Sequence, residues 1–335
     1  MRSSNGGRCV VSSHSALLRR SFLFSTAAAF TLSSCGRSAK RVIGVIPKAT
    51  SHMFFMSVHA GADQAAKDLK LEILWNGPQN ETDFARQIEV VDSMIAQRVS
   101  AIAISACDAN ALVAPLERAI KAGIPVTIFD SGVKIEDYVS FIATGNFEAG
   151  ITAARTIAGF LNGGGEVAMV MQQPGGNSTV LREQAFEQTI AKEFPKMKIV
   201  AQQYCMADPA RSRRVAEDIL AAHPKLGGIF ASSEAASLGS IQALRGRGLA
   251  GKVKLITFDF SKTHVEVLRD GTVTAMMVQD PFHLGYESVR SLYQKLNGEN
   301  PPRHQDLPAR VILKADLAKP EIQNLVEPKW LDESH

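Results

Sequence analysis

The chain has 335 residues, of which 45% are hydrophobic, so it is long enough to bury sizeable cores. Its formal net charge is +4, and the four arginines among residues 1–34 account for all of it because that stretch has no acidic residue. The remainder is formally neutral and has no run of Lys or Arg, which excludes the electrostatic footprint of a nucleic-acid-binding protein.

The first 34 residues have the layout of a cleaved export signal. Arg19 and Arg20 precede an apolar run at residues 22–32, which is too short to span a bilayer. The run leads into Leu-Ser-Ser-Cys35, which matches the bacterial lipobox, where the cysteine thiol receives a diacylglyceryl group. We therefore predict a signal peptide at residues 1–34 and lipidation at Cys35.

This signal predicts a periplasmic or cell-envelope protein that is held to the membrane by its lipid anchor only. The paired arginines followed by Phe22 and Leu23 also resemble a twin-arginine signal, so export by that route and by general secretion both stay open. The competing interpretation is an ordinary N-terminal apolar helix of a cytoplasmic protein.

Beyond the signal, apolar runs alternate with amphipathic helical patterns. Continuous apolar runs are typical of parallel strands that are buried on both faces. We predict strands at residues 42–46, 71–75, 101–105, 126–130, 141–144, 167–171, 198–204, 228–232, 254–259, 274–279 and 310–313. We predict helices at residues 55–69, 83–97, 111–122, 148–161, 181–192, 211–222, 235–245, 264–268 and 284–296.

This alternation predicts an α/β fold built from doubly wound parallel sheets. Roughly 300 mature residues exceed what one such sheet needs and suit two lobes. We predict an N-terminal lobe of residues 41–144 plus 280–305 and a C-terminal lobe of residues 145–279 plus 306–330.

Two cysteines remain once Cys9 and Cys35 are assigned to the signal and its lipid site. Cys107 and Cys205 could pair in an oxidising compartment, but they fall in different predicted lobes, and a bridge would lock a cleft that has to open. We therefore expect free thiols. No spacing of Cys and His indicates a metal site, and we predict neither metal nor cofactor.

Polar and aromatic side chains follow the predicted strands, where ligands bind in open α/β sheets. Aromatic faces pack on the C–H groups of a sugar ring, while charged and amide groups bond to its hydroxyls. The set therefore predicts recognition of a polyhydroxylated ring. Its members are His52, Phe54, Phe55, Asp130, Ser131, Arg182, Ser233, Asp259 and Gln279.

From Arg41 to about Lys314 the chain resembles the type I periplasmic sugar-binding proteins of the ribose-binding group. The resemblance is carried, in order, by Phe54-Phe55 with Gly61-Ala62, Gly123-Ile-Pro-Val126 before Asp130, Asn177-Ser178-Thr179 with Arg182, Thr257-Phe258-Asp259, and Val278-Gln279-Asp280-Pro281-Phe282 with Gly285. It implies two lobes joined by a multi-strand hinge that close on a monosaccharide or related polyol. It also implies that the protein is a monomer and has no enzymatic activity. Its expected role is to deliver the sugar to the permease subunits of an ABC importer.

The resemblance also implies a role for individual residues. Phe54 and Phe55 correspond to the aromatic wall of the sugar pocket. Asp130 and Asp259 correspond to carboxylates that accept from sugar hydroxyls. Arg182 corresponds to the arginine that donates to sugar oxygens, and Gln279 to an amide at the hinge edge. Four positions depart from ribose-binding relatives and leave the identity of the sugar open: His52, Ser131, Ala207 and Ser233.

Each role has a structural alternative. An aromatic pair that opens a helix often belongs to the core, which applies to Phe54 and Phe55. Asp130 and Asp259 could cap the turns that follow them. Arg182 could lie on a solvated helix face. We expect Glu234, which directly precedes the predicted helix at residues 235–245, to cap that helix.

Other classes of protein fit less well. A glycosidase needs a carboxylate pair, but Asp130 and Asp259 fall in different lobes, and no nucleophile elbow, phosphate loop or dinucleotide fingerprint occurs. A transcriptional regulator of this fold needs a helix-turn-helix where this chain has a signal. A receptor that reports its sugar to a chemoreceptor or sensor kinase shares the fold and stays the alternative function.

Overall fold

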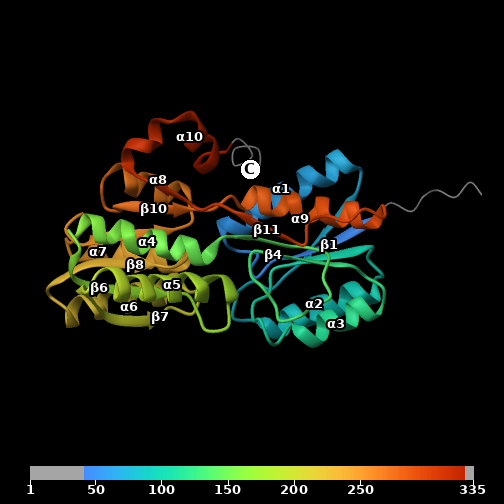
Figure 1. Cartoon of the computed structure of the whole chain (residues 1–335), viewed down its shortest axis with the longest axis horizontal. Helices are drawn as coiled ribbons and strands as arrows, with labels where there is room; N and C mark the ends of the chain where they lie inside the picture. Colours follow the sequence, from blue (N-terminus) through green and yellow to red (C-terminus); the bar gives the residue numbers. More distant parts are fainter. Residues whose placement is uncertain (1–40, 329–335) are drawn as a thin grey trace, which may run out of the picture. The chain divides into compact units, whose positions relative to one another are not determined.

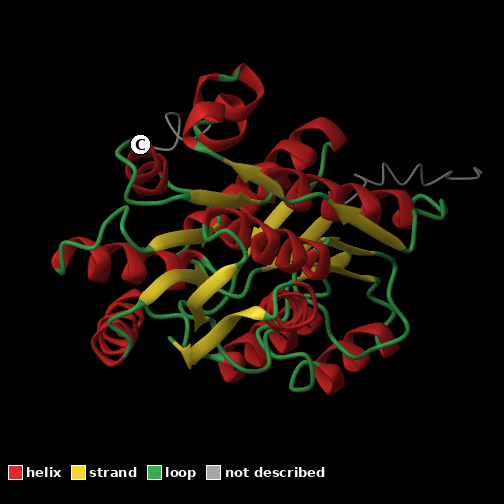
Figure 2. Cartoon of the chain, turned by 60° about the vertical axis from the view of Figure 1, so that its left-hand side comes forward, coloured by secondary structure: helices red, strands yellow, loops and turns green. Residues whose placement is uncertain are grey.

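The computed structural model describes residues 41–328 (Figures 1 and 2). The predicted signal and Cys35 lie outside the described residues. The described part contains two six-stranded sheets with helices packed on their faces. This is the two-lobed, doubly wound α/β fold that the sequence predicts.

The first sheet has the order β11-β5-β4-β3-β1-β2, and all its neighbouring strands are parallel. Its strands are β1 (Val42–Ile46), β2 (Glu72–Trp75), β3 (Ala101–Ile104), β4 (Val126–Phe129), β5 (Phe141–Thr144) and β11 (His304–Leu307). Its helices are α1 (Met53–Leu69), α2 (Phe84–Ala96), α3 (Val113–Lys121) and α9 (Pro281–Leu296).

The second sheet has the order β12-β10-β9-β8-β6-β7 and is parallel except for β12, which pairs antiparallel with β10. Its strands are β6 (Gly164–Met171), β7 (Lys196–Tyr204), β8 (Leu226–Ala231), β9 (Lys254–Phe258), β10 (Ala275–Val278) and β12 (Arg310–Ile312). The helices between them are α4 (Asn146–Phe160), α5 (Asn177–Glu193), α6 (Pro209–Ala222), α7 (Glu234–Gly246) and α8 (Lys262–Arg269).

The chain crosses between the two sheets after β5, after β10 and after β11. The last crossing falls between Leu307 and Arg310, because β11 still pairs with β5 up to Leu307. The boundary that the sequence predicts lies after residue 305. Three connecting segments between two lobes form the multi-strand hinge of the predicted fold class.

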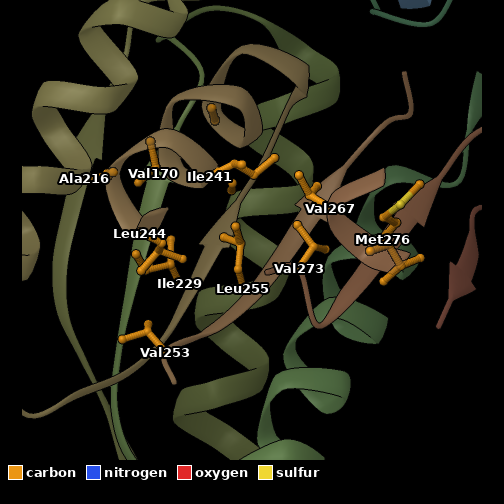
Figure 3. Close-up of a cluster of buried hydrophobic side chains, with 14 of the residues drawn as sticks. Val170, Ala216, Ile229, Ile241, Leu244, Val253, Leu255, Val267, Val273 and Met276 are labelled. Carbon is orange, nitrogen blue, oxygen red and sulfur yellow. The ribbon is translucent and has the colours of Figure 1, made fainter. Parts of the chain in front are cut away.

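Both faces of each sheet are buried, which explains the continuous apolar runs of the strands. One cluster on the second sheet joins Val170, Ile229 and Leu255 from the strands to Ile241 and Leu244 from α7 (Figure 3). Burying each such aliphatic side chain contributes about 1.5–3 kcal/mol. These layers hold the strand ends, and so the loops that follow them, in fixed positions.

The C-terminal region contains elements that the sequence analysis did not predict. Strand β11 reads His-Gln-Asp-Leu and has no apolar alternation, because it forms an edge of the first sheet. A 3-10 helix (Lys314–Ala318) and α10 (Pro320–Val326) follow β12, and α10 lies near α8 in Figure 1. Leu317, Ile322 and Val326 pack into the core of the second lobe.

Several helices begin earlier than their apolar periodicity predicts. Helix α9 begins at Pro281 instead of residue 284, and the Asp280 carboxylate accepts from the His283 N–H at 3.1 Å. Proline suits the first turn because the missing N–H would have no partner there. Within residues 41–328, none of the helices combines the length and apolarity needed to cross a bilayer.

Cys107 and Cys205 are both buried free thiols. Cys107 follows β3 of the first sheet, and Cys205 follows β7 of the second. Burial raises the pKa of the Cys205 thiol to about 12 and also raises the pKa of Cys107. Both therefore stay protonated near neutral pH, which makes them poor nucleophiles.

Candidate functional site

One cavity is lined from both lobes by the loops and helix starts that follow the strands. The cavity is small: the space inside it that the centre of a water molecule can reach is about 20 Å³. The first lobe contributes Lys48, His52, Phe54, Phe55, Glu81 and Asp130, and the second contributes Gln172, Ser178, Thr179, Arg182, Ser233, Glu234, Asp259 and Gln279.

Phe54 and Phe55 form the aromatic side of the cavity at the start of α1. Their ring centroids lie 5.0 Å apart with an edge-to-face angle of 87°. Both side chains are buried and also belong to the core of the first lobe. The two rings therefore anchor α1 in the core of the first lobe and also line the cavity.

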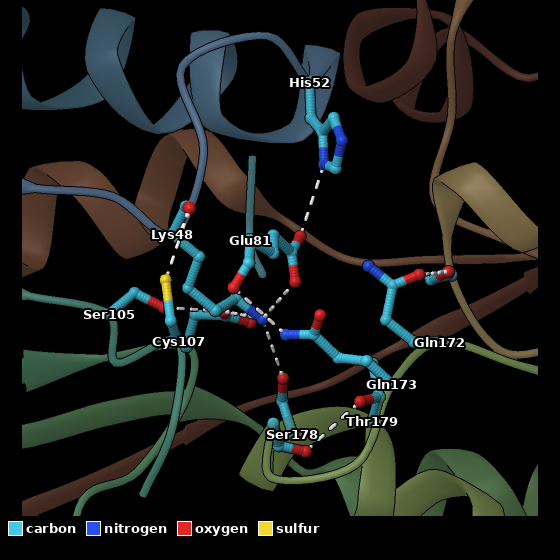
Figure 4. Close-up of polar contacts among 12 residues, drawn as sticks. Lys48, His52, Glu81, Ser105, Cys107, Gln172, Gln173, Ser178 and Thr179 are labelled. Carbon is cyan, nitrogen blue, oxygen red and sulfur yellow. Dashed lines mark hydrogen bonds and ion pairs between the residues drawn. The ribbon is translucent and has the colours of Figure 1, made fainter. Parts of the chain in front are cut away.

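Lys48, in the loop after β1, joins the charged groups of the first lobe (Figure 4). Its Nζ lies 3.2 Å from Asp130 Oδ2, 3.5 Å from Glu81 Oε2 and 3.3 Å from Ser178 Oγ of the second lobe. Burial alone lowers the pKa of Lys48, but Asp130 and Glu81 outweigh that effect and raise it. The ammonium group is therefore charged and offsets part of the negative charge of two buried carboxylates.

His52 and Glu81 form a second ion pair, with His52 Nδ1 lying 3.3 Å from Glu81 Oε1 (Figure 4). Burial lowers the pKa of His52, but the hydrogen bond and charge of Glu81 raise it above its usual value. For Glu81, burial opposes ionisation, and Lys48 and His52 still hold its pKa at about 2. Glu81 is thus an anion that Lys48 and the contact with His52 stabilise.

Arg182 organises the second lobe from within α5. Its side chain is only 2% exposed, so the alternative of a solvated helix face is wrong. Its guanidinium donates to Asn146 Oδ1 at 2.7 Å, to the Ser232 carbonyl at 3.0 Å and to Gln279 Oε1 at 2.9 Å, and it lies 3.7 Å from the centre of the Phe258 ring. Burial lowers the pKa of Arg182, which Asp259 opposes.

Asp259 and Gln279 continue this network at the strand ends. Gln279 Nε2 donates to Asp259 Oδ1 at 2.6 Å, and Thr144 Oγ1 donates to Gln279 Oε1 at 2.6 Å across the hinge. Burial raises the pKa of Asp259, although Arg182 acts against that shift. The amide of Gln279 therefore ties the hinge to the charged groups of the cavity.

All the predicted ligand-binding residues except Ser131 line this cavity. Ser131 is buried beside it, and its hydroxyl has no hydrogen-bond partner among the described residues. Ala207 also lies outside the lining, in a turn where its N–H donates to the Gln172 carbonyl at 3.2 Å. The contact of each residue with a ligand stays a prediction.

The prediction that Glu234 caps α7 is wrong. Ser233 is the capping residue, and its hydroxyl accepts from the Ala236 N–H at 3.3 Å. The same hydroxyl contacts Gln172 Oε1. Glu234 instead directs its carboxylate to the other lobe, where it accepts from the backbone N–H groups of Met53 and Phe54.

Lys48, Glu81 and Gln172 line the cavity but were not predicted. Each lies in a segment that follows the carboxyl end of a strand, namely β1, β2 and β6. The rule that ligands bind at this edge of the sheet was therefore sufficient to indicate them.

Direct contacts join the two lobes around the cavity. Gln173 Nε2 donates to the Glu81 carbonyl at 3.2 Å, and the Ala109 N–H donates to the Gly175 carbonyl at 3.2 Å. With the bond from Lys48 to Ser178, these contacts hold the lobes in a closed arrangement. Two α/β lobes closed over a polar and aromatic cavity define a solute-binding receptor.

The chain belongs to the periplasmic binding protein family, since residues 43–300 match the model of the periplasmic binding protein domain. It is 27% identical to the ribose import binding protein of Bacillus subtilis over 267 residues, which cover 80% of this chain and 85% of that protein.

Solved structures of ABC transporter solute-binding proteins are also similar. A protein from Agrobacterium radiobacter in complex with D-arabinose has 30% identity and a TM-score of 0.84, covering 86% of this chain and 99% of that one. A protein from Agrobacterium vitis with bound D-fucose has 31% identity and a TM-score of 0.83, covering 85% and 99%.

Proposed function

We propose that the protein binds a monosaccharide or related polyol in the cavity between its lobes and delivers it to an ABC importer. The observation that carries this proposal is the lining of the cavity, where an aromatic pair lies opposite a network of Arg182, Asp259 and Gln279. A sugar needs both kinds of surface. The import of ribose by one relative and the arabinose and fucose bound by others support a sugar of this size.

The charge balance of the cavity favours a neutral sugar over a sugar acid or phosphate. Lys48 is paired with Asp130 and Glu81, and Arg182 is held near Asp259. Because these charges already compensate one another, a neutral ligand exchanges hydrogen bonds without leaving a buried ion unpaired. An anionic ligand would add a charge beside several carboxylates.

Binding requires hinge motion. The cavity is small and both lobes line it, so the lobes separate to admit a sugar and close around it. We assign residues 41–144 with the segment from residue 280 through β11 to the first lobe, and residues 145–279 with β12 and α10 to the second. The membership of the strands in the two sheets supports this division.

We further propose that the mature protein is a monomer that begins at a lipidated Cys35 and is held at the outer face of the cytoplasmic membrane. The lipobox motif supports the anchor, and the periplasmic binding protein family supports the compartment. In this position the receptor meets the permease subunits of its importer.

A thermal-shift screen tests the proposal. Protein lacking residues 1–35 is heated with neutral pentoses, hexoses and polyols, and with uronic acids and sugar phosphates. A ligand at 100 times its Kd stabilises the folded state by about 2.7 kcal/mol, which raises the melting temperature by several degrees. We expect a neutral sugar to give this shift and Arg182→Ala to abolish it. A panel without any shift, or a shift unchanged in Arg182→Ala, contradicts the proposal.

A further inference from the structure

Helix α1, which carries the aromatic side of the cavity, has no cap from its own lobe. The N–H groups of the first turn of a helix lack partners within the helix and are usually satisfied by a side chain just before it. Helices α2 and α6 follow this rule, with caps from Asp83 and Asp208. At α1 the capping position is His52, whose side chain makes no capping bond, and the first turn has no acidic residue.

The acceptor for these N–H groups comes from the other lobe. Glu234 Oε1 lies 3.4 Å from the Met53 nitrogen, and Glu234 Oε2 lies 3.3 Å from the Phe54 nitrogen. A carboxylate at this end of a helix also interacts favourably with the helix dipole. The contact spans about 180 positions in the sequence and exists only while the lobes are together.

Glu234 is connected to the groups that line the cavity. Its own backbone N–H donates to Asp259 Oδ2 at 3.2 Å, which links it to the network of the second lobe. His52 lies between the charges of Glu81 and Glu234, both of which raise its pKa. Burial raises the pKa of Glu234 to about 7, against the opposing charge of His52.

We propose that Glu234 is a positioning residue that couples closure of the lobes to sugar affinity by capping α1 across the cleft. This inference rests on the proposed function. When the lobes separate, water satisfies the N–H groups of Met53 and Phe54. When they close, that water is lost and Glu234 replaces it, so closure leaves neither N–H group buried without an acceptor, as it would if Glu234 were absent.

Three variants test this role. Glu234→Ala removes the acceptor, Glu234→Gln keeps an acceptor oxygen, and Asp208→Ala removes an ordinary cap within the second lobe. Affinity for the sugar found in the screen is measured by titration calorimetry. Exchange of the Met53 and Phe54 amide protons is measured by NMR on each protein.

We expect Glu234→Ala to weaken sugar binding about tenfold, the order of effect of a lost helix cap, and to speed exchange of both amides. Glu234→Gln should lose affinity by an intermediate amount, because its single amide oxygen replaces only one of the two carboxylate oxygens that accept from Met53 and Phe54. Asp208→Ala should lower the melting temperature and leave the affinity unchanged. Wild-type affinity and exchange in Glu234→Ala, or equal losses in the Ala and Gln variants, would overturn the proposal.

The amide measurement separates this inference from the proposed function. If no sugar binds the wild-type protein, the proposed function fails, but the exchange of the two amides still reports whether Glu234 caps α1. If sugar binds and Glu234→Ala does not change the exchange of the two amide protons, only the capping role is contradicted.

Discussion

Asp130 and Asp259 occupy equivalent positions in the two lobes. Asp130 follows β4 and Asp259 follows β9, and each of these strands is third from the same edge of its sheet. Both residues have left-handed backbone, with φ of 55° and 69°, and both line the cavity. Strained backbone of this kind is concentrated at functional sites. The two halves of the fold thus each contribute an aspartate to the lining of the cavity.

Because Asp259 has a left-handed backbone, Asp259→Ala and Asp259→Asn should differ in their free energy of unfolding. Asn tolerates positive φ and Ala does not, so Asp259→Ala should unfold with a free energy about 1 kcal/mol lower than Asp259→Asn. Both should lose sugar affinity about 100-fold, because each removes a buried charged partner of a hydroxyl. Urea unfolding and titration calorimetry measure the two effects. Equal unfolding free energies for the two variants would show that the backbone at this position is unstrained.

Helices α1 and α9 approach closely enough to require glycine at the contact. A Cβ atom at Gly285 would lie 2.0 Å from the Val58 carbonyl oxygen, which is backbone and cannot move aside. Gly285→Ala should therefore lower the free energy of unfolding by about 1–3 kcal/mol.

Gly159 in α4 is the matched control for this substitution. Nothing lies within 4 Å of a Cβ atom built there, so Gly159→Ala should raise the free energy of unfolding by about 0.5–1 kcal/mol. Denaturant titration of the two variants measures both changes. The same sign of change in both would contradict the packing argument.

His264 should make the stability of the protein depend on pH. The side chain is 0% exposed, and its Nε2 has no hydrogen-bond partner among the described residues. Burial lowers the pKa of His264 to about 4. Between about pH 6.5 and pH 4, the unfolded chain therefore binds one more proton than the folded protein. The free energy of unfolding is highest above pH 6.5 and decreases as the pH falls from 6.5 to 4.

Between pH 6.5 and pH 4, titration of His264 lowers the free energy of unfolding by about 3 kcal/mol. In His264→Phe the ring stays apolar and cannot titrate, so the difference in unfolding free energy between pH 7 and pH 4.5 should shrink by about 2 kcal/mol. Urea unfolding at the two pH values measures it. An undiminished difference would mean that His264 is protonated in the folded protein.

Cys35 should determine whether the protein fractionates with membranes. In a bacterial host the wild-type chain should sediment with the membrane fraction, since a lipidated cysteine supplies stable anchoring. Cys35→Ala removes the lipid attachment site and should release the protein into the soluble fraction. Cys205→Ala, at a buried thiol, is the control and should leave the distribution unchanged. Membrane association of Cys35→Ala would refute the lipobox interpretation.

The central strands and the helices between them followed directly from the sequence because their signals are local. The run Val42–Ile46 is apolar at nearly every position since both faces of its sheet are covered. β11 was missed because an edge strand with exposed residues carries no such signal. The short helix α10 was missed because only Ile322 and Val326 are buried in it.

Some features of the site could likewise be predicted from the sequence, and others could not. Sequence alone indicated the two-lobed class, the aromatic pair Phe54 and Phe55, and the aspartates at the strand ends, because those features depend on short patterns and on the direction of parallel strands. Only the tertiary structure decided which side chains are partners. Lys48 meets Ser178 across 130 positions of the chain, and Glu234 meets the start of α1 across about 180. These contacts form because the two lobes approach each other and exclude water from between them. No short stretch of sequence indicates which residues meet in this way.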